Sequence, residues 1–453
     1  MKKQNEITLR EFILYAAVIV LVSLYSRLIG IPLVGTFLLL IFAAYLKLLS
    51  ARFEEKKYNL LSLSFLFLLG VALIEFMRDY TQFSPYIIPV SVFSMLVALL
   101  YHDLELSLIF SVSLSVFTGL VYEGDLYLAA VLMVGSIAGS LLVWQARRRS
   151  KIITAGFFVG IIQALCILTF LRHLGLRSMP VFRLCSIPFM NGVFSSFIVA
   201  GILPVFEFLF NITTNISLLE LADFNHPLLK RLVFEAPGTY HHSLMVGNLS
   251  EMAAEAVGAN ALLARVGAYY HDIGKLDKPE YFSENQDKYS SKHDQLSASM
   301  STLVIMDHVK SGVDLARRSR LHKSILDFIT QHHGTSLVYY FYRRALESTE
   351  SEAGVQEEVF RYPGPKPQTK ETAIVLLADS VEAACRTLEE PTPERISDVV
   401  RKIINNKFID GQLDMCDLSL KDLEIIASTF IHILGAIYHS RIEYPEQNKG
   451  ETN

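Results

Sequence analysis

Apolar segments long enough to cross a lipid bilayer recur through the first 210 residues of this chain. A transmembrane helix needs about 20 predominantly apolar residues. Short polar breaks divide this half into eight such segments, at 11–30, 32–49, 59–77, 86–101, 104–122, 127–145, 153–172 and 188–210. The mean hydropathy of +0.36 and the hydrophobic content of 51% are also typical of a membrane protein with a soluble part. Residues 1–210 are therefore predicted to form a polytopic membrane domain of about eight helices.

The charged residues divide the chain at the same place. Residues 1–210 hold 16 Lys and Arg against 11 Asp and Glu, whereas residues 211–453 hold 25 against 34. The second half is thus polar and acidic. Because non-specific nucleic-acid binding requires a basic surface, no nucleic-acid partner is expected.

Basic residues beside the apolar segments predict how the chain crosses the membrane, since Lys and Arg concentrate on the cytoplasmic side. With eight spans, both the N-terminus and the second half lie in the cytoplasm. Arg172, Arg177 and Arg183 then fall outside, against the rule. No small-residue cleavage site follows the first segment, so it is expected to be an anchor. The clusters on the cytoplasmic side are Lys2, Lys3 and Arg10; Lys47, Arg52, Lys56 and Lys57; and Arg147, Arg148, Arg149 and Lys151.

The second half, 211–453, shows helical periodicity almost throughout and little strand signal. Helices are predicted at 218–234, 241–257, 260–272, 297–310, 323–333, 370–388, 394–406 and 419–440. Residues 346–371 are instead rich in Glu and end in PGPKP, which is typical of an exposed loop. This loop is either a lid over an active site or only a connector. The fold class is therefore all-α, with a membrane domain followed by a helical cytoplasmic domain.

Candidate metal ligands occur in a defined order at the ends of these predicted helices. They are His242, the pair His271-Asp272, His308, the pair His332-His333, and Asp379. Imidazole and carboxylate are the ligands that suit iron, manganese or zinc, and two such ions can together promote phosphate displacement. His241 is expected to be exposed or to support its neighbour. Isolated histidines are more often structural, and this applies to His226, His293, His322 and His439.

The order H…HD…H…HH…D resembles the HD-domain phosphohydrolase superfamily in its dinuclear form. Longer strings narrow the resemblance to the 7TM-HD family, the PgpH-type cyclic-di-AMP phosphodiesterases, over about residues 60–440. Members of that family carry a large extracellular domain after the first span, where this chain has only residues 30–35. The strings are EAPGTYHHS at 235–243, GAYYHDIGK at 267–275, EYFSENQ at 280–286 and FRYPGPKP at 360–367.

The resemblance implies two divalent metal ions, most consistent with iron or manganese. One would be bound by His242, His271, Asp272 and Asp379, and the other by Asp272, His308, His332 and His333, with Asp272 as the bridge. A metal-activated hydroxide would open one phosphodiester of cyclic-di-AMP and give pApA. Lys275 would reach a phosphate oxygen or, alternatively, serve only as a helix C-terminal cation. Tyr269, Tyr270 and Phe282 are candidate stacking surfaces for the bases. The location implied is the inner membrane of a bacterium, and whether the chain forms a homo-oligomer stays open.

Two alternatives remain at this point. The first is a cyclic-di-GMP phosphodiesterase of the HD-GYP type, but that family has Gly-Tyr-Pro after its histidine pair, where this chain has Gly334-Thr335-Ser336. The second is a membrane receptor that binds a nucleotide without hydrolysing it. The complete ligand set argues against a receptor, because binding alone does not need two metals.

Overall fold

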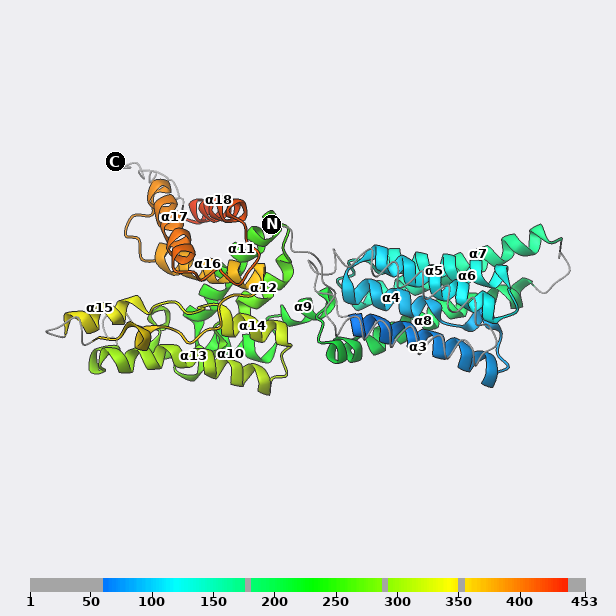
Figure 1. Cartoon of the computed structure of the whole chain (residues 1–453), viewed down its shortest axis with the longest axis horizontal. Coiled ribbons are helices and arrows are strands. Elements are labelled where there is room, and N and C mark those ends of the chain that lie inside the picture. Colours follow the sequence, from blue (N-terminus) through cyan, green and yellow to red (C-terminus); the bar gives the residue numbers. More distant parts are fainter. Residues whose placement is uncertain (1–59, 176–180, 287–291, 349–354, 439–453) are drawn as a thin grey trace, which may run out of the picture. The chain divides into compact units, whose positions relative to one another are not determined.

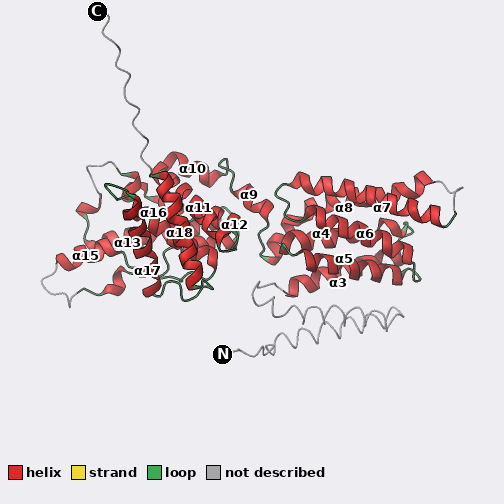
Figure 2. Cartoon of the chain, turned by 90° about the horizontal axis from the view of Figure 1, so that it is seen from above, coloured by secondary structure: helices red, strands yellow, loops and turns green. Residues whose placement is uncertain are grey.

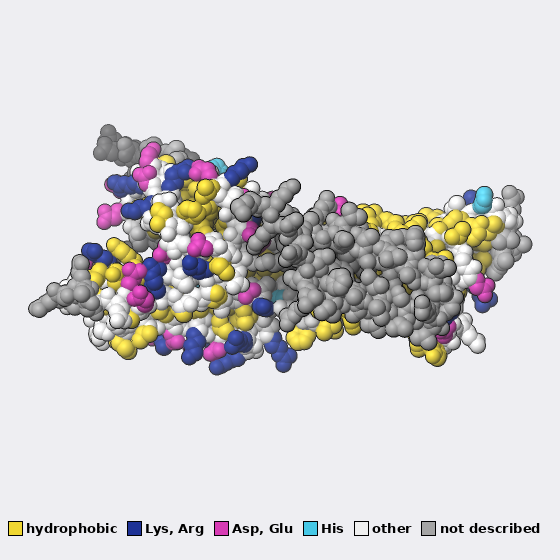
Figure 3. All heavy atoms as spheres, viewed as in Figure 1, with side chains coloured by type: hydrophobic (Ala, Val, Ile, Leu, Met, Phe, Trp, Pro, Cys, Tyr) yellow, Lys and Arg dark blue, Asp and Glu magenta, His cyan; other side chains and the backbone are white. Residues whose placement is uncertain are grey.

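The chain forms two compact units, Met1–Ile216 and Ser217–Asn453. The structure is a computed structural model that describes residues 60–175, 181–286, 292–348 and 355–438. Within these residues every regular element is a helix, and no strand is present (Figure 2). This confirms the all-α fold class. Figure 3 shows the difference in surface between the units, with hydrophobic side chains over much of the visible first unit and charged side chains over the second.

The described part of the first unit is built from apolar helices, and five of them are long and apolar enough to cross a membrane. They agree with the predicted segments from residue 59 onward, except for 86–101. The first two predicted segments, 11–30 and 32–49, lie outside the described residues. A multi-pass membrane protein is therefore confirmed. The spanning helices are α3 (Leu60–Tyr80), α5 (Leu104–Val121), α6 (Leu126–Val143), α7 (Arg149–His173) and α8 (Val181–Phe210) (Figure 1).

The segment predicted as a span at 86–101 is shorter than expected. A 3₁₀ turn, η1 (Pro85–Ile87), comes first, and α4 covers only Val90–Tyr101, a helix of 12 residues. Pro89 precedes its first turn and His102 ends it in a left-handed conformation with φ of 51°. Every residue of α4 is buried, so neighbouring helices cover all its faces. Burial among apolar neighbours is also expected of a central membrane helix, so the span at 86–101 stays a prediction.

Small residues allow α7 and α8 to approach closely. A Cβ atom on Gly192 of α8 would lie 2.3 Å from the backbone nitrogen of Gly160 on α7. Because lipid offers no hydrophobic force between helices, such small residues let backbones meet and gain van der Waals contact. On the same helix, the Asn191 Nδ2 atom donates hydrogen bonds of 2.9 and 3.0 Å to the carbonyls of Tyr86 and Ile88. These bonds supply donors that lipid could not to the backbone of η1 and of the residue after it.

The second unit is a bundle of helices joined by short 3₁₀ turns. The predicted helix at 218–234 is wrong: it is two helices, because Pro227 disfavours helical backbone at the residue before it and Asp223 accepts from the Asn225 backbone nitrogen. The predicted helix at 297–310 continues to Arg318. The helices are α9 (Asn215–Leu221), α10 (Pro227–Glu235), α11 (Pro237–Ala256), α12 (Ala261–Tyr270), α13 (Ala298–Arg318), α14 (Lys323–Gln331), α15 (Tyr339–Glu347), α16 (Lys370–Cys385), α17 (Pro393–Ile409) and α18 (Leu420–Ile437).

Helix α16 forms the centre of this bundle. Six consecutive residues, 373–378, are apolar and fully buried, as expected for a helix that is covered on all sides. They pack in one core with residues of α11, α12, α17 and α18. The rigid core fixes the residues of α16 that follow, Asp379 and Glu382, which are also buried. The position of this helix therefore determines where its acidic side chains lie.

Candidate metal centre

The seven predicted ligands meet at one place in the second unit, although they come from five helices. His242 lies on α11, His308 on α13 and Asp379 on α16, while His271-Asp272 and His332-His333 directly follow α12 and α14. Their ligand atoms form two sets, each within 4.8 Å: His242, His271, Asp272 and Asp379; and Asp272, His308, His332 and His333. Asp272 belongs to both sets. Its Oδ2 atom faces His271 of the first set, and its Oδ1 atom faces His308 of the second. This is the division that the family resemblance implied.

Hydrogen bonds orient four of the imidazoles. The Nδ1 atoms of His271, His308 and His332 lie 2.6, 2.5 and 3.0 Å from the backbone carbonyls of Ala268, Ile305 and Phe328. Since a carbonyl only accepts, each Nδ1 must donate, and Nε2 is the nitrogen that faces Asp272. His242 makes the corresponding bond from Nδ1 to the Glu382 carboxylate. Such bonds fix the tautomer and the ring direction of metal-binding histidines.

Two buried atoms at the middle of the centre have no hydrogen-bond partner in the described structure: Nε2 of His271 and Oδ1 of Asp272. Leaving a buried polar atom unsatisfied costs free energy. Nε2 of His271 and an oxygen of Asp272 are also the atoms that would bind an ion, together with Asp379 Oδ1 at 3.8 Å from the same nitrogen. The residues present therefore fit a pair of divalent metal ions.

The electrostatics of the centre keep Asp272, Asp379 and His308 in ligand form. The two carboxylates also outweigh burial and raise the pKa of His271 to about 10, so that ring must release a proton when an ion binds. Burial opposes charge on Asp272, but His271 and Lys275 outweigh it and hold the pKa of Asp272 well below its usual range. Likewise, hydrogen bonds from His242 and His271 outweigh burial and hold the pKa of Asp379 low. Burial lowers the pKa of His308 to about 4, so its ring is neutral. Ionised carboxylates and neutral imidazoles are the forms that bind metals.

Lys275 lies between two carboxylates. Its Nζ atom is 2.8 Å from Asp272 Oδ2 and 2.7 Å from Glu284 Oε1. Burial works against the charge of Lys275, but Asp272 and Glu284 outweigh it and raise the pKa of the ammonium. Glu284 in turn accepts from Thr239 Oγ1 at 3.2 Å. Lys275 is on a 3₁₀ turn, η2 (Ile273–Asp277), and its close ion pairs distinguish it from a simple helix-end cation.

Sequence reasoning missed two side chains that support the ligands. Glu382 bonds His242 and lies three residues after Asp379 on the same buried helix; the Asp-x-x-Glu spacing was the available signal. Tyr362 stacks on His333, with ring centroids 4.2 Å apart and an interplanar angle of 29°. Its backbone nitrogen donates to the Ser336 carbonyl at 3.0 Å. The FRYPGPKP string contains Tyr362, but nothing in the string indicated this contact.

The three candidate stacking residues have different environments. Tyr270 is fully buried and its hydroxyl donates to the Leu221 carbonyl at 2.8 Å, so the prediction that it stacks on a base is wrong. Tyr269 is half-buried and its ring contacts Phe224. Phe282 is buried at the centre itself, 5.8 Å from the His308 ring and 5.0 Å from Lys275 Nζ. Of the three, only Phe282 is shown in contact with ligand side chains.

The histidines outside the set are separate from the centre. His241 is exposed. His293 is buried, with Nε2 2.8 Å from the Tyr281 carbonyl and its ring against Phe341. His322 caps α14 through its side chain, and His439 lies outside the described residues. These positions agree with a structural role for the three described histidines His226, His293 and His322, of which His226 packs edge-on against Tyr270.

Residues 346–371 were predicted to be either a lid over the active site or a connector. Residues 349–354 lie outside the described residues. The rest contains the end of α15 and a 3₁₀ turn, η7 (Glu357–Phe360). It is tied to the loops around the centre: Arg361 Nη1 donates to the Thr335 carbonyl at 3.0 Å, and the Gln368 nitrogen donates to Gln331 Oε1 at 2.9 Å. The described part is thus anchored beside the centre.

Replacing Glu382 by Gln is expected to lower metal affinity about 10- to 100-fold, because His242 loses a charged acceptor that orients it. Metal titration of the purified chain measures this. Glu389→Gln, an exposed carboxyl a few residues later, is the matched control and should bind metal like the unaltered chain. Equal affinities of the two variants would contradict the orienting role of Glu382.

A helical unit that joins H, HD, H, HH and D ligands in two sets sharing one aspartate is an HD domain, here in a chain whose other unit is apolar helices. Comparison with known families agrees. The HD domain family matches residues 239–384, and the family described as 7TM receptor with intracellular HD hydrolase matches residues 25–214. The chain is thus similar to the 7TM-HD family over most of its first unit and to the HD domain family over much of its second.

Individual relatives are similar over most of the chain. It is 39% identical over 431 residues to the cyclic-di-AMP phosphodiesterase PgpH of Bacillus subtilis (strain 168), covering 91% of this chain and 60% of that protein. It is 44% identical over 301 residues to PgpH of Listeria monocytogenes serotype 1/2a (strain 10403S), covering 66% and 42%. The crystal structure of the L. monocytogenes PgpH HD domain in complex with cyclic-di-AMP is 47% identical, covers 48% of this chain and 100% of that one, and superposes with a TM-score of 0.46. The chain thus spans about two fifths to three fifths of the curated relatives' length.

Proposed function

We propose that this protein is a membrane-anchored phosphodiesterase that hydrolyses cyclic-di-AMP to pApA. The observation that carries the proposal is the pair of ligand sets joined at Asp272, with orphaned buried atoms directed between them. Both PgpH relatives bear the name cyclic-di-AMP phosphodiesterase and share 39% and 44% identity with this chain. Residues 211–453 are the proposed HD phosphohydrolase domain, and residues 1–210 the membrane domain.

The residues of the centre have distinct proposed tasks. Asp272 holds both ions, and the five histidines and Asp379 complete their coordination. When bound, two divalent ions supply an activated water at neutral pH and positive charge opposite the phosphoryl oxygens. Lys275 keeps Asp272 ionised and in place. A lysine ammonium has three donors, and since Asp272 and Glu284 take two of them, the third is available to a phosphoryl oxygen of the substrate.

Iron or manganese is the proposed metal. Each set contains at least two imidazoles together with carboxylate, a mixture that suits these metals, whereas magnesium prefers oxygen ligands. Elemental analysis of the metal-replete full-length chain should find about two ions per chain. Fewer than one would contradict the dinuclear centre.

Hydrolysis assays distinguish the proposed activity from its alternatives. The full-length chain in detergent, supplied with Mn²⁺ or Fe²⁺, is expected to convert cyclic-di-AMP to pApA much faster than it converts cyclic-di-GMP. A many-fold preference for cyclic-di-GMP would favour the HD-GYP type of reaction. Binding of cyclic-di-AMP without any product, at every metal tested, would instead indicate a receptor.

We also propose that both the N-terminus and the HD domain face the bacterial cytoplasm. The basic clusters beside the apolar segments support this orientation, as does the intracellular HD hydrolase in the description of the matching family. A reporter fused after Asn453 should be active only in the cytoplasm, and activity outside the membrane would reverse the topology.

A further inference from the structure

A lysine near the metal centre has a hydroxyl as its hydrogen-bond partner. Lys407 lies near the end of α17, and its Nζ atom donates to Ser336 Oγ at 2.7 Å. Ser336 is buried and follows His333 by three residues, and its backbone nitrogen donates to the His333 carbonyl at 3.0 Å. The ammonium of Lys407 is therefore held against the turn that carries a metal ligand.

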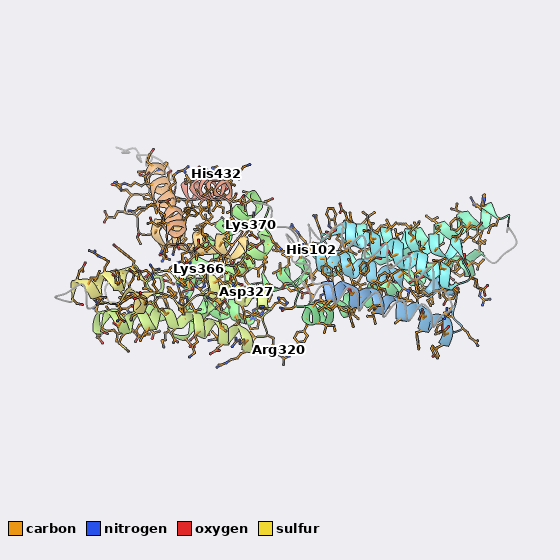
Figure 4. The ribbon with its side chains drawn as sticks, viewed as in Figure 1. His102, Arg320, Asp327, Lys366, Lys370 and His432 are labelled. Carbon is orange, nitrogen blue, oxygen red and sulfur yellow. The ribbon has the colours of Figure 1, made fainter. Side chains whose placement is uncertain are left out.

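No acidic side chain pairs with Lys407 within the described part of the chain. The nearest acid in sequence, Asp410, accepts instead from Arg361 at 3.0 Å and from Gln412 at 2.8 Å. Other lysines of this unit do have acidic partners. Lys366 is 3.3 Å from Asp414 and Lys370 is 3.1 Å from Asp422 (Figure 4 labels both lysines). Lys275, at the centre, has Asp272 and Glu284.

The environment of Lys407 suits an anion that arrives from outside the protein. Burial lowers the pKa of this ammonium, and the more distant carboxylates of Asp379 and Asp410 only partly offset it. A half-buried charge without an opposite charge is costly, and such groups concentrate at functional sites. An anionic ligand beside Lys407 would supply the missing charge.

The open side of the metal centre is the side of Lys407. Among the seven ligands, His333 and Asp379 retain the largest exposed fractions of side chain, 21% and 10%, whereas the other five are at most 3% exposed. Substrate must therefore approach past His333 and Asp379. Lys407 is bonded to the turn of His333, and its charge is close enough to interact with Asp379.

We propose that Lys407, positioned by Ser336, binds the second phosphate of the substrate, the one that is not cleaved. This inference rests on the proposed function, because a cyclic dinucleotide carries two phosphodiesters joined in one ring. Lys275 lies beside Asp272, which both ligand sets share, and so serves the phosphate that is cleaved. Two cations at different edges of the centre would select a ligand with two phosphates over one with a single phosphate.

The test compares substrates with two phosphates and with one. In Lys407→Gln, the KM for cyclic-di-AMP should rise about 10-fold or more, as for loss of one charge-assisted hydrogen bond, while kcat changes little. Hydrolysis of bis(p-nitrophenyl) phosphate, a diester with a single phosphate, should be unaffected. Calorimetric binding of the product pApA should weaken by a similar factor and binding of AMP should not. Lys407→Arg keeps the charge and should restore most of the affinity.

Controls separate this role from a structural one. Lys402→Gln removes the same charge from an exposed position of the same helix and should behave like the unaltered chain. The proposal is overturned if Lys407→Gln affects both substrate types equally, or neither, or if Lys407→Arg is no better than Lys407→Gln. An unaltered chain that neither binds nor cleaves cyclic-di-AMP would overturn the proposed function itself. Normal cleavage by Lys407→Gln would overturn only the second-phosphate subsite.

Discussion

Asp272→Ala is expected to reduce kcat/KM for cyclic-di-AMP by roughly 10³-fold or more, the scale seen when an essential catalytic group is removed. Asp272 is the only ligand shared by the two sets in the described structure, so its loss leaves both sets with three ligands. Elemental analysis should show that both ligand sets lose their metal ion. Steady-state kinetics of the full-length chain, with the metal content of the same preparation, measures both effects.

Two further variants test whether these effects are specific to the loss of the shared ligand Asp272. Asp277→Ala removes an exposed carboxylate from η2, the 3₁₀ turn that directly follows Asp272, and should leave both activity and metal content unchanged. His308→Ala removes a ligand from one set only, so about one ion per chain should remain. If Asp272→Ala kept near-normal hydrolysis, the shared-aspartate mechanism would be wrong.

The order of the ligand residues made the centre predictable from sequence. Metal chemistry restricts the ligand types, so His242, His308, the two pairs and Asp379 could be recognised before any fold was known. The expectation that all of them lie at helix ends is correct only for the two pairs, since His308 and Asp379 lie within α13 and α16. The structure brings these residues together. Supporting contacts were not predictable in the same way, because they join distant parts of the chain. Glu382 and His242 are 140 residues apart, and Lys407 and Ser336 are 71 apart.

Residue type alone does not predict the role of a side chain when that role depends on where the side chain points and how deeply it is buried. Tyr270 directly precedes His271, yet its side chain turns into the core and bonds the Leu221 carbonyl. Hydropathy predicted a membrane span at 86–101, but it could not predict that protein rather than lipid surrounds every residue of α4. A sequence average responds to both environments equally, since burial in protein and burial in lipid require the same apolar side chains.

Gly274→Ala is expected to damage both stability and activity, although it adds only one methyl group. A Cβ atom at this position would lie 1.8 Å from the His308 carbonyl oxygen and 2.5 Å from the Gly312 nitrogen. Both are backbone atoms of α13, so no side-chain rotation can relieve the clash. Either α13 or the turn that follows Asp272 must move, and the two ligand sets would then separate. We expect the free energy of unfolding to fall by about 3 kcal/mol, at the upper end for overpacking.

The activity loss should exceed what unfolding alone explains, because His308 and Asp272 must stay within ligand distance and a displacement of about 1 Å can cost roughly 100-fold in rate. Thermal unfolding of the full-length chain in detergent measures the first effect, and hydrolysis at a temperature where the variant stays folded measures the second. Gly435→Ala is the matched control: it lies in α18 of the same unit, and its added Cβ would meet no atom within 4 Å. Alanine there should be neutral or stabilising, since it favours helix over glycine by about 1 kcal/mol. If Gly274→Ala matched Gly435→Ala in both measurements, the close approach of α13 to the turn after Asp272 would not be what holds the two ligand sets together.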